Sequence, residues 1–146
     1  MSATADVPLL DVAVVGAHLS GLPLNGEITA LGGVLVRALR TEPCYRLFCL
    51  PGGPPLRPGL LRVAPGEGHA IAVEVWGIPT GKIGALLAAI PSPLGLGTLR
   101  LEDGSMPRGF LVEPEGLRGA EDISRFGGWR AFLAERGAPI PSGSPA

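Results

Sequence analysis

Glycine and proline are concentrated in three stretches of the chain, and this clustering is the strongest constraint on how it folds. The stretches are GAHLSGLPLNG (16–26), LPGGPPLRPG (50–59) and IPSPLGLG (90–97). Proline lacks a backbone donor and glycine does not restrict its backbone, so such stretches form neither helices nor the interior of a sheet. We expect three loops, kept ordered by their prolines, which reduce the entropy lost on folding.

The content of apolar residues indicates a folded chain in spite of its 23 glycines and 16 prolines among 146 residues. Such a composition also occurs in disordered chains. Disordered chains, however, have little apolar surface to bury, whereas 46% of the residues here are hydrophobic and 17% are charged. We predict one compact domain over residues 11–136, with an extension before it (1–10) and a flexible tail after it (137–146).

Charge and hydropathy argue against several classes of partner. The formal net charge is -1 and no run of basic residues occurs, so we expect neither nucleic acid nor an anionic membrane as a partner. The longest apolar runs, 12–17 and 83–91, are far shorter than the roughly 20 residues of a membrane-spanning helix. A secretory signal begins with a basic region, but residues 1–36 contain no Lys or Arg. We therefore expect a cytoplasmic protein.

The two cysteines, Cys44 and Cys49, are expected to be free thiols. They are five residues apart in a predicted strand, and an odd spacing places side chains on opposite faces, which is poor geometry for a disulfide. The only other soft metal ligands, His18 and His69, have no recognisable spacing. We expect no metal site and no cofactor.

Apolar and β-branched runs between the loops predict an α+β domain. The expected strands cover residues 11–17, 34–41, 45–50, 70–78, 98–101 and 109–113. A short internal helix is expected over 80–90, and a terminal amphipathic helix over 126–136, where Phe126, Trp129 and Leu133 recur at helical spacing. Short connections favour mixed or antiparallel pairing, in a small sheet or barrel that a helix covers.

His18 is the first candidate for a catalytic group. It follows a predicted buried strand, in a loop that contains Gly16 and Gly21. Imidazole titrates near neutral pH and can donate or accept a proton. The alternative is a structural histidine that holds its own loop in place by hydrogen bonds. The residues alone leave both roles open.

Two arginines and one glutamate are further candidates. Arg46, next to Tyr45, and Arg57, in the second loop, are suited to an anionic ligand because guanidinium forms paired hydrogen bonds with carboxylates. The alternative for each is a solvated or ion-paired side chain. Glu74 lies within the apolar run AVEVWGI. It either faces solvent or is buried with a partner, and in the second case it is a candidate acid or base.

Six segments together resemble the carboxy-terminal domain of allophanate hydrolase. They are VVGAHLSGLPLNGEITALGG, TEPCYRLFCLPGGPPLRPG, VEVWGIP, IPSPLGLGTLRLEDG, GFLVE and DISRFGGWRAFL. The resemblance extends from about Asp11 to Ala134, with the motifs in the family's order. It implies a fold similar to that of γ-glutamylcyclotransferases, a small mixed barrel whose first strand leads into a substrate-binding loop. Residues 16–21 stand in the place of that loop.

The resemblance also implies an activity. In full-length allophanate hydrolase an amino-terminal amidase domain deaminates allophanate. The carboxy-terminal domain of the family has been assigned the decarboxylation of the resulting N-carboxycarbamate, with a histidine of the GAHLSG loop implicated. His18 is the matching residue. Because this sequence lacks the amidase domain, we do not expect the chain to hydrolyse allophanate by itself.

We therefore expect His18 to donate a proton to a small carboxylated substrate, and the three glycine- and proline-rich loops to line one mouth of the barrel. The candidate substrate-binding residues are Leu19, Ser20, Gly21, Tyr45, Arg46, Arg57, Glu74 and Ser92. Loop N–H groups around 19–21 are expected to hold a carboxylate.

Other functions stay open at this stage. A non-catalytic module that binds a small anion or a separate amidase protein fits the same residues, and a homodimer is a further alternative. Cyclotransferase activity is disfavoured, since that family places a catalytic glutamate near the end of the helix that follows the VEVW-like strand. No carboxylate occurs here between Glu74 and Glu102.

Overall fold

The structure is a computed structural model that describes residues 7–137. Its strands are β1 (Leu9–Val14), β2 (Val34–Arg40), β3 (Tyr45–Cys49), β4 (Pro58–Arg62), β5 (Ala72–Pro79), β6 (Leu94–Thr98), β7 (Arg108–Val112) and β8 (Glu121–Asp122). Its α-helices are α1 (Asn25–Ala30), α2 (Ile83–Ala89) and α3 (Trp129–Gly137), and short 3₁₀ helices are η2 (Thr80–Lys82), η3 (Pro114–Leu117) and η4 (Ser124–Phe126). Residues 1–6 and 138–146 of the predicted extension and tail lie outside the described residues.

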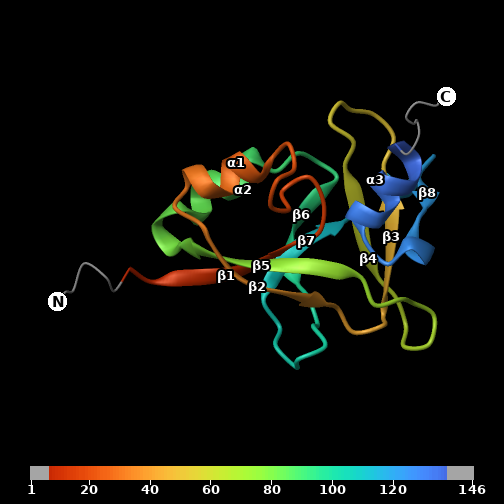
Figure 1. Ribbon diagram of the computed structural model, residues 1–146, viewed down its shortest axis with the longest axis horizontal. Coiled ribbons are helices and arrows are strands. Elements are labelled where there is room, and N and C mark those ends of the chain that lie inside the picture. The colour runs from red at the N-terminus through yellow and green to blue at the C-terminus, as the bar shows by residue number, and fades with distance from the viewer. Residues whose placement is uncertain (1–6, 138–146) are drawn as a thin grey trace.

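The strands form two sheets (Figure 1). The larger has the order β2-β5-β1-β7-β6, and the smaller has the order β4-β3-β8. β1 pairs antiparallel with β5 and parallel with β7, so the larger sheet is mixed. This confirms the predicted α+β class with mixed pairing.

The barrel predicted from the short connections is not closed within residues 7–137. β2 and β6 are the two edges of the larger sheet, and neither pairs with a strand of the smaller one. The physical reason lies between β2 and β3. The chain leaves the larger sheet after the isolated bridge of Thr41 to Leu101, passes Pro43, and then pairs with β4 and β8 instead.

The sequences of β1 and β5 explain their central position. In β5 all residues from Val73 to Ile78 are buried, and in β1 the exposed fraction of Val12, Ala13 and Val14 is 1% or less. A strand covered on both faces requires a nearly continuous apolar run, and both sequences supply one. Glu74 is the single ionisable residue inside the buried part of β5.

A glycine allows the two sheets to approach each other closely. A Cβ placed on Gly59 of β4 would lie 3.0 Å from the Cβ of Val112 in β7, which is tighter than nearly all real Cβ contacts. The smaller sheet therefore packs its β4 against β7. This brings the second glycine- and proline-rich loop next to the end of β1.

The helices cover different parts of the sheets. Figure 1 shows α1 and α2 together on one side of β1 and β5, and α3 beside β8 at the other end of the molecule. Ile28 of α1, Leu86 of α2, and Trp129 and Phe132 of α3 are buried in one core cluster. No helix within residues 7–137 combines the length and apolar character needed to cross a membrane.

Several element predictions were shifted or incomplete. β1 covers Leu9–Val14 rather than 11–17, β6 covers Leu94–Thr98 rather than 98–101, and β4 begins inside the predicted second loop. The first expected loop (16–26) contains the start of α1, and neither β4 nor β8 was among the expected strands. Each of these segments is short or rich in glycine, so backbone pairing and packing decided its structure rather than intrinsic propensity.

Candidate functional site

The loop that follows β1 folds back on itself. The N–H of Leu19 donates to the carbonyl of Gly16 at 2.9 Å, and the N–H of Leu24 donates to the carbonyl of Ala17 at 2.8 Å. The side-chain amide of Asn25 donates to the carbonyl of His18 at 2.8 Å. These bonds place His18 at a fixed position between the end of β1 and the start of α1.

The imidazole of His18 is held on one side and open on the other. Its Nε2 lies 2.9 Å from Oε1 of Glu27, and the ring lies 5.0 Å from the ring of Phe110, centroid to centroid. Within residues 7–137 its Nδ1 has no hydrogen-bond partner. The one fully buried side-chain nitrogen or oxygen without a partner there belongs to Arg100, so Nδ1 of His18 is not fully buried.

Two neighbouring cavities meet at Arg57. The small cavity, about 20 Å³, is lined by residues 14–18, Leu24, Arg57, Pro58, Leu94 and Phe110. The large cavity, about 540 Å³, is lined by residues 50–55, Arg57, residues 91–94, Glu115, Gly116 and Arg118. Arg57 and Leu94 belong to both. A volume of several hundred Å³ is typical of small-molecule sites, whereas the small cavity has room for about one water.

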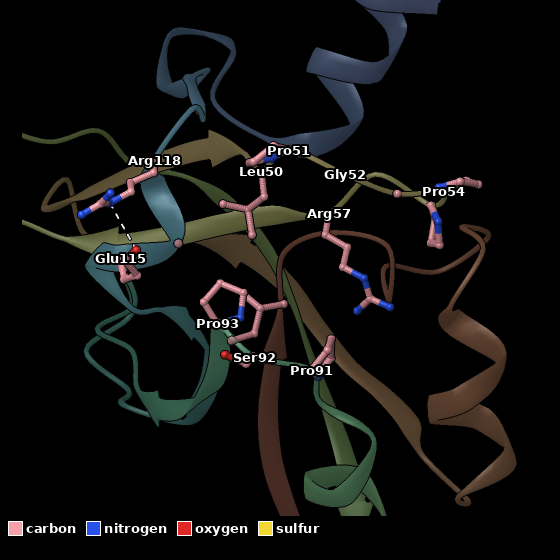
Figure 2. A pocket seen from close by; sticks show the side chains of 14 residues that line it. Leu50, Pro51, Gly52, Pro54, Arg57, Pro91, Ser92, Pro93, Glu115 and Arg118 are labelled. Carbon is pink, nitrogen blue, oxygen red and sulfur yellow. Dashed lines mark ion pairs between the residues drawn. The ribbon is translucent and has the colours of Figure 1, made fainter.

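The guanidinium of Arg57 is available to a ligand. Figure 2 shows it extending toward Pro91, away from the ion pair of Arg118 with Glu115. In the described part of the chain, Arg57 forms neither an ion pair nor a side-chain hydrogen bond, while Nε of Arg118 lies 3.2 Å from Oε2 of Glu115. The large cavity therefore contains one unneutralised positive charge close to His18.

The three glycine- and proline-rich loops do converge, as the sequence predicts. All three contribute to the small cavity, through residues 14–18, Arg57 with Pro58, and Leu94. The contact is close, because a Cβ added to Gly16 would collide with the ring of Pro58. They form the mouth of a cavity between two sheets rather than the mouth of a barrel.

Glu74 is buried, with its charge satisfied by the loop above it. Its exposed fraction is 6%. The N–H and hydroxyl of Ser20 donate to its two oxygens at 2.8 Å each, and Nε1 of Trp76 donates at 3.0 Å. An Nη of Arg130, in α3, lies 3.2 Å from Oε2 and also donates to the hydroxyl of Ser20. Of the two alternatives, burial with a partner is the one the structure shows.

The environment of Glu74 keeps it ionised. Burial raises the pKa of its carboxyl, but the N–H of Ser20, the indole of Trp76, the Ser20 hydroxyl and the charge of Arg130 together bring it below its ordinary value. A carboxylate whose oxygens already accept these bonds is an anchor for the loop. It does not line the small or the large cavity.

The comparisons with known proteins decide the family. A family model described as "Allophanate hydrolase C-terminal domain" matches residues 10–134. The chain belongs to this family. It is 40% identical over 127 residues to the urea amidolyase of Saccharomyces cerevisiae, which covers 85% of this chain but 7% of that protein.

Solved structures give the same result. The structure is similar to the allophanate hydrolase of Kluyveromyces lactis, with a TM-score of 0.87 and 35% identity over 92% of this chain and 22% of that one. It is also similar to c4763, a uropathogenic E. coli-specific protein, with a TM-score of 0.80 and 35% identity over 86% of this chain and 96% of that one. The allophanate hydrolase C-terminal domain thus occurs within long chains and in a chain of about its own length.

The fold agrees with the γ-glutamylcyclotransferase-like architecture expected from the sequence. An AIG2-like protein from Mus musculus has a TM-score of 0.55 with this chain at 20% identity, covering 75% of it. At that identity the likeness concerns the fold alone.

The structure does not bring all predicted residues of this allophanate hydrolase C-terminal domain together. Tyr45 is fully buried, and its hydroxyl accepts a hydrogen bond from the N–H of Arg100 at 2.9 Å. Arg46 forms an ion pair with Asp122 at 2.9 Å. Neither residue lines the cavities around His18 and Arg57, whereas Ser92 lines the large one.

Two of the three predicted carboxylate-binding N–H groups of the loop are already bonded within the protein. Those of Leu19 and Ser20 donate to Gly16 and Glu74, and Gly21 adopts a φ of 80°. In the described residues, the N–H groups of Ala17 and His18 have no acceptor, and both residues line the small cavity. Within residues 7–137, backbone N–H groups without an acceptor therefore occur at Ala17 and His18 as well as at Gly21, one of the predicted positions.

Two residues of this site were not found from the sequence. Glu27 is nine positions from its partner His18, and Arg130 is 110 positions from Ser20. The segment FGGWRAFL belongs to the family resemblance, yet nothing in its pattern indicates that Arg130 reaches the first loop. Within residues 7–137, no group of three or more His, Cys, Asp or Glu side chains is arranged to hold a metal ion.

Proposed function

We propose that this domain decarboxylates N-carboxycarbamate, or a similar small N-carboxylated urea compound, in urea and allophanate degradation. The observation that carries the proposal is that His18 and Arg57 line one cavity, and that each has a side-chain nitrogen without a partner within residues 7–137. An acid beside a cation is the arrangement that decarboxylation of a nitrogen-bound carboxylate requires. The family membership supports the substrate class.

In this proposal Arg57 binds the substrate, and His18 protonates its nitrogen. N-carboxycarbamate has two carboxylates bonded to the same nitrogen, and the guanidinium of Arg57 pairs with one of them. The N–H groups of Ala17 and His18 are placed to receive carboxylate oxygens at the small cavity. Ser92 contributes a hydroxyl to the large cavity, where the rest of the substrate is accommodated.

The chemical step balances with a single proton. The C–N bond to the departing carboxylate breaks, its electron pair passes to nitrogen, and the carboxylate becomes carbon dioxide. Protonated His18 donates its Nδ1 proton to that nitrogen, which leaves carbamate as the second product. Glu27 holds Nε2 at 2.9 Å, orients the ring and stabilises its positive charge. Solvent then restores the proton on His18.

In the experiment that tests this proposal, the substrate is generated within the assay. A separate amidase acting on allophanate generates N-carboxycarbamate, and carbon dioxide release is followed with and without the purified domain. We expect acceleration over buffer, a loss of about 100-fold or more in the catalysed rate for His18→Ala, and weaker substrate binding for Arg57→Gln. Arg125→Gln, an exposed change outside both cavities, is the matched control. A domain that gives no acceleration, or a His18→Ala variant as active as the parent, would refute the decarboxylase.

A second candidate is a module that binds a separate amidase protein. It is favoured by an exposed apolar strip on the edge strand β2, where the exposed fractions of Val34, Leu35 and Val36 are 51%, 49% and 46%. The chain also spans only 22% of the matched Kluyveromyces lactis allophanate hydrolase. Light scattering of a mixture with the amidase tests this candidate. A complex that Leu35→Lys abolishes supports it, and the absence of any complex at tens of micromolar argues against it.

A further inference from the structure

A third cavity lies at the end of the β3–β4 pair opposite to the site of His18 and Arg57. It has a volume of about 390 Å³ and is lined by residues 42–44, Arg62, Val63, Pro65, Gly66 and Arg100, which we call the arginine cavity. The strand register sets its distance from the first site, because Tyr45 pairs with Arg62 at this end and Cys49 with Pro58 at the other. Five residues of strand place the two ends roughly 15 Å apart.

The side chain of Arg100, which lines this cavity, has an unsatisfied donor. Its Nε is the one fully buried side-chain nitrogen or oxygen in residues 7–137 that has no hydrogen-bond partner. Buried donors without a partner are rare in folded proteins, since each forfeits the bond it made to water. An acceptor that reaches this side chain from the cavity would remove the deficit.

The backbone of Arg100 fixes where that donor stands. Its N–H donates to the hydroxyl of Tyr45 at 2.9 Å, and its carbonyl accepts from the N–H of Glu42 at 2.9 Å. Tyr45 is itself completely buried. The base of the Arg100 side chain is therefore held on both sides by the wall of the cavity.

A second guanidinium makes the cavity positive. Arg62 is exposed at the end of β4. Neither Arg62 nor Arg100 forms an ion pair within residues 7–137. Glu42 is the single carboxylate among the lining residues and forms no ion pair with either arginine. Burial raises the pKa of the Tyr45 hydroxyl above its ordinary value, while the charges of Arg62 and Arg100 oppose this, so both guanidiniums act on the same place.

We propose that the arginine cavity is a binding site for a small oxyanion, a molecule with a carboxylate or phosphate group. The edge of a guanidinium formed by Nε and one Nη matches two oxygens of such a group. Arg100 supplies a guanidinium from the cavity wall, and Arg62 adds the second positive charge from the rim. The proposal is independent of the proposed decarboxylation, because the arginine cavity shares no lining residue with the cavities of His18 and Arg57.

An NMR titration of the ¹⁵N-labelled protein tests the site. Inorganic phosphate and malonate are the two probes, each added at constant ionic strength, and the tighter of the two identifies the preferred group. We expect saturable shifts of the amides of Cys44, Val63 and Arg100 with either probe. Arg62→Gln and Arg100→Gln should each weaken binding by about tenfold, and Arg125→Gln should leave it unchanged.

The outcomes separate the site from general charge effects. Arg62 is exposed, so Arg62→Gln decides the question even where Arg100→Gln fails to fold. Shifts that do not saturate, shifts confined to residues 16–18, or equal weakening by Arg125→Gln would each overturn the proposal.

Discussion

The carboxylate of Glu27 lies 2.9 Å from Nε2 of His18, across the turn that joins β1 to α1. The side chain of His18 is 11% exposed and that of Glu27 is 49% exposed. The pair therefore stands at the boundary between the core and solvent, and Nδ1 of the imidazole has no partner within residues 7–137. A histidine oriented by a carboxylate is a recurrent arrangement for proton transfer.

Removing the charge of Glu27 is expected to slow the proposed reaction. In Glu27→Gln the side chain keeps its length, but the neutral amide no longer stabilises the imidazolium form. We expect the catalysed rate of carbon dioxide release to fall by about tenfold, with little change in the free energy of unfolding. Glu135→Gln, an exposed change in α3, is the matched control. A Glu27→Gln variant with parental activity would show that Glu27 only supports the loop.

Replacing Glu74 is expected to destabilise the protein in a pH-dependent way. Burial raises the pKa of this carboxyl, but its hydrogen bonds and Arg130 bring it below its ordinary value. A lowered pKa in the folded state means that the stabilisation is present above the unfolded pKa and is lost as pH falls through the folded one. Glu74→Gln should cost about 1–3 kcal/mol near pH 7 and much less below both pKa values. Urea denaturation of Glu74→Gln and the parent, near pH 7 and at a pH below both pKa values, measures the loss in free energy of unfolding. An equal loss at the two pH values contradicts the prediction.

Arg130 is expected to hold the His18 loop from α3. Its guanidinium contacts Glu74 and both oxygens of Ser20. In Arg130→Ala we expect the amide of Ser20 to exchange with deuterium about tenfold faster, because its bond to Glu74 is less firmly held. Arg136→Ala removes an arginine of the same helix that lies over the ring of Phe132. If both variants leave exchange at Ser20 unchanged, Arg130 does not support the loop.

Gly16 is expected to tolerate no side chain. A Cβ at this position would collide with Cγ and Cδ of Pro58, where the first two loops meet. Gly16→Ala should therefore lower the free energy of unfolding by about 1–3 kcal/mol and displace the residues beside His18. Gly81→Ala is the control, since nothing lies within 4 Å of its Cβ position. Thermal unfolding compares the two, and equal melting temperatures would show that Pro58 moves aside without cost.

The local sequence pattern was sufficient to predict the elements whose apolar side chains are packed in the core. The apolar run of β5 predicted a buried strand, and Phe126, Trp129 and Leu133 predicted a helix over 126–136. Both elements are present, but α3 begins at Trp129, and Phe126 lies in η4. Pattern failed where segments are short. α1 has six residues and β8 has two, and elements of that length are stabilised by tertiary contacts rather than by propensity.

The candidate site shows the same division. His18, Arg57 and Ser92 were identified from chain position and family motifs, and all three line the connected cavities. Arg46, next to Tyr45, was expected beside them because a guanidinium suits an anionic ligand. The structure uses the Tyr45 hydroxyl for the backbone of Arg100 and the Arg46 charge for Asp122.

The sequence by itself determined the family, the apolar strands β1 and β5, and the concentration of glycine and proline that lets three loops meet at Gly16, Pro58 and Leu94. Only the tertiary structure decided that the strands form two sheets, that Glu74 anchors the loop, and that Arg57 stays unpaired while Arg46 does not. The physical reason is the separation along the chain over which each effect acts. Propensity and hydrophobic period act between neighbours, whereas the partners of a charge are set by residues that lie far away in the chain.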